Sequence, residues 1–213
     1  MYTDYSKKIQ SNIIYLHQLR VEGIKNAKKI IGKSLFLEDI YFLSLVDKCL
    51  RLTDGFLKMI ESRNLTCSGF MLRIQLDICM RTYAIFIAED KDKVQKSIFS
   101  NKYQLNKLKS EEGVKMTDGY LSGRLNEIDP TFKEVYKNTS GYIHHSEQAF
   151  YSINRSDTVF SNQIAFDIGH ELPHSFDKIL NECIEAFNYF VEFFYKLLDP
   201  VIKSKEKFDN ENQ

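Results

Sequence analysis

The chain has 213 residues, of which 43% are apolar and 13% aromatic, so it can bury a core and is not a disordered chain. Its 29 basic and 29 acidic side chains cancel, which argues against a strongly basic nucleic-acid-binding domain but leaves room for a local basic groove. Only 3 Pro and 9 Gly interrupt the chain, and so few helix breakers favour long helices over many short strands.

The first three predicted elements are long helices. Apolar residues at spacings of three and four predict a helix over residues 4–31, which Gly32 closes as a C-cap. A second helix is predicted over residues 36–62, and its two apolar stripes indicate neighbours on both sides. The third, over residues 66–89, is apolar on nearly every side, as is typical of a helix in the middle of a bundle.

The second half of the chain is less regular. Residues 91–110 are rich in lysine and predict a shorter solvated helix or a loop, and residues 111–129 predict a connector with about one helical turn. Asp129 and Pro130 fit the N-cap and first turn of a fourth main helix that runs to about Ile153. Alternation of apolar residues favours a small β-hairpin over residues 158–168.

The last main helix is predicted from near Pro173 to about Lys203, where a charged, frayed tail over residues 204–213 follows. We therefore expect an all-α fold, a single helical bundle domain of about five main helices over residues 1–203.

Compartment and cofactors are predicted mainly from what the sequence lacks. The cysteines lie in apolar runs without a CxxC or Cys/His metal spacing, so we expect buried free thiols in a reducing cytoplasm. There is no apolar signal region and no apolar run long enough to span a membrane, so no membrane partner is expected. No Gly-rich phosphate loop follows a strand, and we expect no cofactor.

A polar stripe crosses the otherwise apolar third helix. Arg73, Asp77 and Arg81 lie at intervals of four residues and therefore on one helix face. Buried charges are costly unless they are paired, so other groups must meet these side chains. Either Asp77 bridges the two arginines and fixes the register of the bundle, or a guanidinium stays free to bind a phosphate or carboxylate.

The densest polar cluster lies in the fourth main helix. Ser140, His144 and Glu147 share one helix face, whereas His145 points about 100° away. A histidine beside a hydroxyl and a carboxylate can act as a general base because its pKa lies near neutrality. The alternative is a core histidine that hydrogen-bonds to the Arg/Asp stripe. No HxxxH or HExxH spacing occurs, and no metal site is predicted.

Two short segments resemble a group of bacterial all-helical proteins. The run Leu72-Arg73-Ile74-Gln75-Leu76-Asp77, followed by Arg81, is similar to their LRxxLDxxxR helix, and Thr139-Ser140-Gly141-Tyr142-Ile143-His144 is similar to their SGYIH segment. These proteins are distantly similar to HEPN domains, small helical bundles that are often ribonucleases in toxin–antitoxin and phage-defence systems. The resemblance implies RNA as substrate, a homodimer whose paired sites form one cleft, and a catalytic His144.

The HEPN signature is an arginine and a later histidine with four to six residues between them, and this chain departs from it. Lys137, Asn138 and Thr139 occupy those positions before His144. Asn138 is then the candidate polar residue of the signature, and Arg73 or Arg81 would supply the positive charge from across the bundle.

Two functions stay open at this point. One is a metal-independent ribonuclease of bacterial defence or stress response, with His144 as general acid/base, Arg73 or Arg81 on the scissile phosphate, and Ser140 or Asn138 orienting it. The other is a non-catalytic helical module that binds a protein partner through its aromatic-rich last helix, or a small anionic ligand. The remaining candidate binding residues are Asp77, Tyr142 and Glu147.

Overall fold

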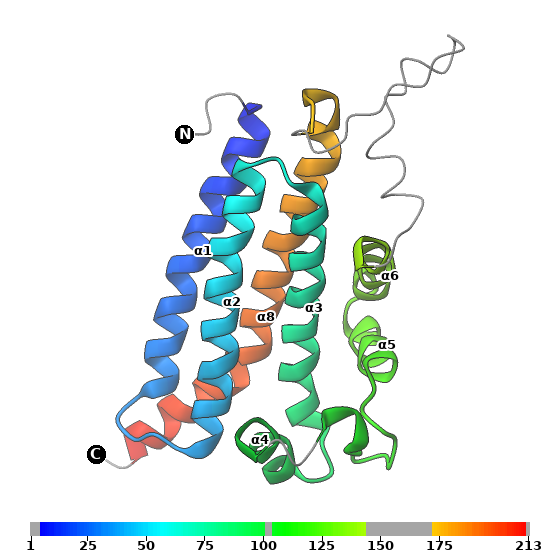
Figure 1. The fold of residues 1–213 in the computed structure, drawn as a ribbon. Coiled ribbons are helices and arrows are strands. Elements are labelled where there is room, and N and C mark those ends of the chain that lie inside the picture. The colour runs from blue at the N-terminus through cyan, green and yellow to red at the C-terminus, as the bar shows by residue number, and fades with distance from the viewer. Residues whose placement is uncertain (1–4, 101–103, 144–171, 212–213) are drawn as a thin grey trace.

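Four long helices form a bundle in the computed structural model of the chain (Figure 1). They are α1 (Lys7–Ile31), α2 (Leu37–Glu61), α3 (Leu65–Ile87) and α8 (Asp177–Glu211). The structure describes residues 5–100, 104–143 and 172–211, without the side chains of 97–100 and 140–143. Helices α1, α2 and α3 alternate in direction, as their short connections require, and α8 packs against both α1 and α3.

Helix α8 runs parallel to α1, which the sequence does not predict. Near the start of both helices, Asn12 Nδ2 donates to Asn181 Oδ1 over 2.9 Å. Further along both, the Tyr195 hydroxyl donates to the carbonyl oxygen of Leu19 over 3.0 Å. The four helices therefore form a square in which α1 lies diagonally across from α3 and α2 diagonally across from α8 (Figure 1).

The core is built from the apolar faces that the periodicity predicts. Helix α3 contacts α2, α8, α5 and α6, as its apolar surface on nearly every side indicates. Aromatic rings fill the space between the long helices, and the rings of Phe56 and Phe187 stack with centroids 3.9 Å apart. The largest fully buried side chains are Phe42, Phe56, Phe132, Phe187, Phe190 and Phe194.

The described part also contains three shorter α-helices, α4 (Lys91–Ser100), α5 (Asp118–Ile128) and α6 (Thr131–Ile143), and two 3₁₀ helices, η1 (Leu105–Lys107) and η3 (His174–Phe176). The prediction of about one helical turn within residues 111–129 is wrong in extent, because α5 has 11 residues. Thr117 caps it by accepting a hydrogen bond from the backbone N–H of Tyr120 over 3.2 Å. Leu121 and Leu125 are fully buried, and this packing outweighs the glycines that lower the helix propensity of the segment.

The start of α6 agrees with the predicted cap. Asp129 Oδ1 accepts a hydrogen bond of 3.0 Å from the backbone N–H of Thr131, the first residue of α6. The predicted extension of this helix to Ile153 and the predicted hairpin over 158–168 lie outside the described residues. Within the described ranges the all-α class is confirmed, with seven α-helices instead of about five and no strands, only isolated bridges.

The prediction of a frayed tail over residues 204–213 is wrong as far as Glu211, because α8 continues to that residue. Its last turns, red in Figure 1, reach the connection between α1 and α2. There Lys205 is buried and bonded to Asp39 over 2.5 Å and to the carbonyl oxygen of Ser34. Asp209 accepts a hydrogen bond of 2.9 Å from the backbone N–H of Lys33. These contacts keep the charged end of α8 helical although Pro200 lies within the helix, just before this segment.

Across the residues that the structure describes, no helix combines the length and the apolar character needed to cross a membrane.

Candidate functional site

The polar stripe of α3 separates into two environments, and the first surrounds Arg81. Its Nη2 lies 2.8 Å from Asp77 Oδ1 and 2.8 Å from Oδ1 of Asp118 on α5. Asp77 lies 3.5 Å from Nζ of Lys48 on α2. Burial lowers the pKa of Arg81 and the two carboxylates raise it, with a net upward shift. Arg81 is therefore neutralised twice and joins α3 to α5, while Asp77 joins it to α2.

Arg73 lies in the second environment, between α3 and α6. Its guanidinium carbon is 3.8 Å from the centroid of the Tyr136 ring. Its Nε is buried and has no hydrogen-bond partner. Asp77 pairs with Arg81 and Lys48, and does not bridge the two arginines of the stripe. A guanidinium stacked on a ring keeps its edge free for donating hydrogen bonds.

The other arginines show how unusual Arg73 is. The described part of the chain contains six arginines, and five of them pair with a carboxylate: Arg20, Arg51, Arg63, Arg81 and Arg124. Within the same residues Arg73 pairs with none. Because a guanidinium stays protonated at any physiological pH, Arg73 holds a positive charge that no described carboxylate neutralises. This charge is the strongest indication of an anion site in the described structure.

The candidate residues on α6 are brought to Arg73 only in part. Helix α6 packs against α3 and brings Tyr136 to Arg73, and in the sequence His144 follows the last residue of α6, Ile143. Asn138 is exposed and follows Tyr136 by two residues, about 200° around the helix, so it is not brought to Arg73. Ser140 and Tyr142 belong to α6, but their side chains, like all of His144 and Glu147, lie outside the described parts.

An open pocket of about 570 Å³ lies beside Arg81. Its lining comes from the end of α3, the start of α5 and the segment between α4 and α5: Arg81, Gln104, Leu105, Asn106, Thr117 and Asp118. The charged groups of the lining, Arg81 and Asp118, are bonded to each other. The pocket therefore offers amide and hydroxyl groups to a ligand, and no free charge among the described residues.

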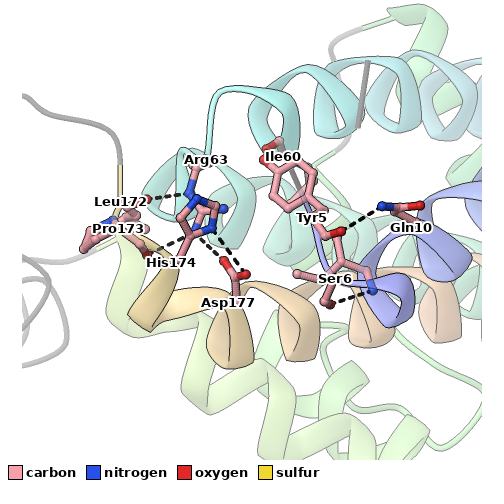
Figure 2. Close-up of polar contacts among 10 residues, drawn as sticks. Tyr5, Ser6, Gln10, Ile60, Arg63, Leu172, Pro173, His174 and Asp177 are labelled. Atoms are coloured by element: carbon pink, nitrogen blue, oxygen red, sulfur yellow. Dashed lines mark hydrogen bonds and ion pairs between the residues drawn. The ribbon is translucent and has the colours of Figure 1, made fainter. Parts of the chain in front are cut away.

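Sequence analysis missed Arg63, which lies in the turn between α2 and α3 with a left-handed backbone (φ 51°). Its guanidinium donates to the carbonyl oxygens of Leu172 and Pro173 over 2.5 and 2.9 Å, and to Asp177 over 2.5 Å (Figure 2). The ring of Tyr5 lies 5.4 Å from its guanidinium carbon. Arg63 thus holds the start of α8 to the α2–α3 turn, a structural role that no sequence pattern indicates.

The cysteines follow the prediction of buried free thiols only in part. All four cysteines are free, and Cys49 and Cys79 are buried, but Cys183 is only partly buried and Cys67 is exposed, because it lies in the first turn of α3. Burial raises the pKa of Cys49 to about 12, which makes it an unreactive thiol at neutral pH. In the described ranges no three His, Cys, Asp or Glu side chains gather as a metal site would require.

Comparisons with protein-family models, with curated proteins and with solved structures find no match to this chain. We therefore infer a function from the geometry around Arg73.

Proposed function

We propose that this chain is a HEPN-like, metal-independent ribonuclease in which Arg73 holds the scissile phosphate and His144 is the general acid/base. The observation that supports this proposal most is the positive charge of Arg73, which has no carboxylate partner in the described structure and stacks on Tyr136 of α6. His144 directly follows Ile143, the last residue of α6. In this proposal Arg73 of the neighbouring helix α3 replaces the arginine that the HEPN signature has before its histidine.

In the proposed reaction, His144 removes the proton of a ribose 2′-hydroxyl, whose oxygen attacks the adjacent phosphorus. The bond from phosphorus to the 5′-oxygen of the next nucleotide breaks, and that oxygen takes up a proton. The products are a 2′,3′-cyclic phosphate and a free 5′-hydroxyl. Arg73 donates two parallel hydrogen bonds to the non-bridging oxygens, where negative charge increases in the transition state.

We assign the orienting role to Ser140 and not to Asn138. Ser140 follows Tyr136 by one helical turn along α6, whereas Asn138 follows it by two residues and is exposed. Arg81 is left out of the proposed reaction because Asp77 and Asp118 neutralise it. A cytoplasmic role in bacterial defence or stress response is part of the same proposal, and it depends on the resemblance described above.

The second candidate is a non-catalytic module that uses the same Arg73 to bind a small anion or an acidic protein partner. The pairing of Arg81 with Asp77 and Asp118 favours this second candidate. It leaves one guanidinium of the stripe, that of Arg73, for an anion, and one guanidinium is enough to bind an anion without catalysis. Both candidates predict an anion site at Arg73, and they differ in whether His144 completes a reaction there.

Cleavage of end-labelled total RNA in the presence of EDTA tests the proposal. We expect the wild type and Arg51→Met to cleave, since Arg51 lies on the solvated face of α2 and pairs with Asp47. Arg73→Met and His144→Ala should each lower the rate about 100-fold or more, the usual loss for a transition-state donor or a general acid/base. Unchanged cleavage by either variant would contradict its assigned role. Absence of cleavage by the wild type, with an anion affinity that Arg73→Met lowers, would support the second candidate.

A further inference from the structure

Helix α1 carries an exposed apolar seam, which we define as Ile14, Val21, Ile24 and Ile31. Their exposed fractions are 59%, 52%, 37% and 46%. The intervals between them are seven, three and seven residues, which is the spacing of the a and d positions of a heptad. The two other positions of this pattern are also exposed and hold His17 and Lys28.

The seam is separate from the apolar face that α1 uses in its own bundle. That inner face consists of residues packed against α2 and α8: Ile9, Ile13, Leu16, Leu19 and Ile30. Helix α1 lies at the edge of the molecule opposite α5 and α6 (Figure 1), and the seam residues on it are exposed. Exposed apolar residues that follow one another along a helix mark a binding face, and heptad spacing fits the side chains of a second helix.

The order of residues along the seam identifies the partner helix. The pattern is symmetric about the point between Val21 and Ile24, so that it is the same in both directions along the helix. An antiparallel copy of α1 centred at this point places Val21 opposite Ile24 and Ile14 opposite Ile31. Every apolar seam residue then meets an apolar one, which is the self-complementarity that a two-fold interface requires.

Charge selects the same arrangement. In the antiparallel pair, Lys28 faces His17 of the second copy, and a neutral imidazole can accept a hydrogen bond from an ammonium group. In a parallel pair, Lys28 would face Lys28, which brings like charges together inside the seam. Arg20, beside the seam, is bonded to Asp54 of its own chain over 2.6 Å and does not add to the charge of the interface.

We infer that a second copy of this chain binds the seam, with the two α1 helices antiparallel. The seam from Ile14 to Ile31 is about 26 Å long at 1.5 Å per residue, a small interface, so a dimer of roughly micromolar affinity is expected. Because α1 lies diagonally across from α3, the two Arg73 side chains would lie on opposite outer faces of the dimer. This differs from the single shared cleft that the HEPN resemblance implies.

Cysteine cross-linking tests the geometry of the pair. In a Cys67→Ser background, which removes the exposed native thiol, Ile14→Cys and Ile31→Cys are prepared separately and then mixed under mild oxidation. The antiparallel arrangement predicts a disulfide-linked dimer in the mixture and none in either variant alone, because identical positions lie about 26 Å apart. A cross-link in each variant alone would overturn the antiparallel arrangement in favour of a parallel one.

Sedimentation of the unmodified chain over a range of concentrations gives an independent answer. We expect a monomer–dimer equilibrium that Val21→Lys weakens at least tenfold. Ile179→Lys replaces an isoleucine of similar exposure on α8, outside the seam, and should leave the equilibrium unchanged. A wild type that stays monomeric at about 1 mM and gives no mixed cross-link would overturn the inference. RNA cleavage plays no part in either experiment, so this result is independent of the proposed function.

Discussion

Arg73 and Arg81 belong to one stripe of α3, yet their neighbours give them different properties. Two carboxylates neutralise Arg81, one of them from α5, whereas Arg73 meets the ring of Tyr136 on α6. The sequence predicts the stripe and its need for partners, since the spacing of four residues is local. It cannot predict which partners, because Asp118 and Tyr136 come from later helices whose packing is decided by the whole fold.

The buried pair of Lys205 and Asp39 allows a direct test of a single interaction. The two side chains are 3% and 7% exposed and lie 2.5 Å apart. Removing one partner leaves a buried charge without compensation, so Lys205→Ala should lower the free energy of unfolding by about 3–5 kcal/mol. Urea denaturation measures this change. The double variant Lys205→Met/Asp39→Leu should recover most of the loss, and an equally unstable double variant would show that the charges are not what matters.

At the scale of the elements, the sequence predicts the long helices well and their ends less well. The first three predicted helices agree with the structure to within about three residues at each end, because apolar periodicity and caps are local signals. The sequence predicts them over 4–31, 36–62 and 66–89, and they are α1 (Lys7–Ile31), α2 (Leu37–Glu61) and α3 (Leu65–Ile87). For the 11 residues of α5 the sequence predicts only about one helical turn, and it ends the last helix near Lys203, before the last turns of α8. Both depend on contacts with distant parts of the chain, which local propensity does not contain.

The last turns of α8 should contribute to stability in proportion to these contacts. A chain that ends at Lys203 loses Lys205, the Asp209 bond to Lys33, and the ring contact of Phe208 with Phe36 at 5.0 Å. Asp39 would then be buried without its cation. We expect the midpoint of urea denaturation to fall markedly compared with a chain that ends at Glu211, which should match the full chain. If the full chain and the two shortened chains had equal midpoints, the last turns of α8 would not stabilise the fold, as expected for a frayed tail.

The junction between α5 and α6 should make stability depend on acid pH. Burial raises the pKa of Asp129, but its carboxylate accepts hydrogen bonds of 2.6 Å from the hydroxyl groups of Thr131 and Tyr189, which lower the pKa. The net result is a pKa below the ordinary value. The stabilisation is complete above a pH of about 4 and is lost as the pH falls through the lowered pKa. Asp129→Asn should therefore cost about 1 kcal/mol at pH 7 and less at pH 3 in urea denaturation. An equal cost at both values would contradict this account.

At the scale of the whole molecule, the two inferred functions occupy opposite sides of the bundle. Arg73 lies where α6 covers α3, and the apolar seam lies on the outer face of α1. The sequence predicts an all-α bundle from its few breakers and its apolar faces. It does not predict that α8 runs parallel to α1, because this depends on the path of the chain between α6 and α8. Nor does it predict that Arg73, and not Arg81, is free for an anion.

The most direct test of the anion site at Arg73 is the affinity for a labelled single-stranded 2′-O-methyl RNA, which cannot be cleaved through its 2′-oxygen. Fluorescence anisotropy at low salt compares the wild type, Arg73→Met and the control Arg51→Met. A hydrogen-bonded ion pair is worth about 1.5–3 kcal/mol, so Arg73→Met should weaken binding roughly tenfold or more while Arg51→Met stays within about twofold. Equal affinities of Arg73→Met and the wild type would contradict an anion site at Arg73.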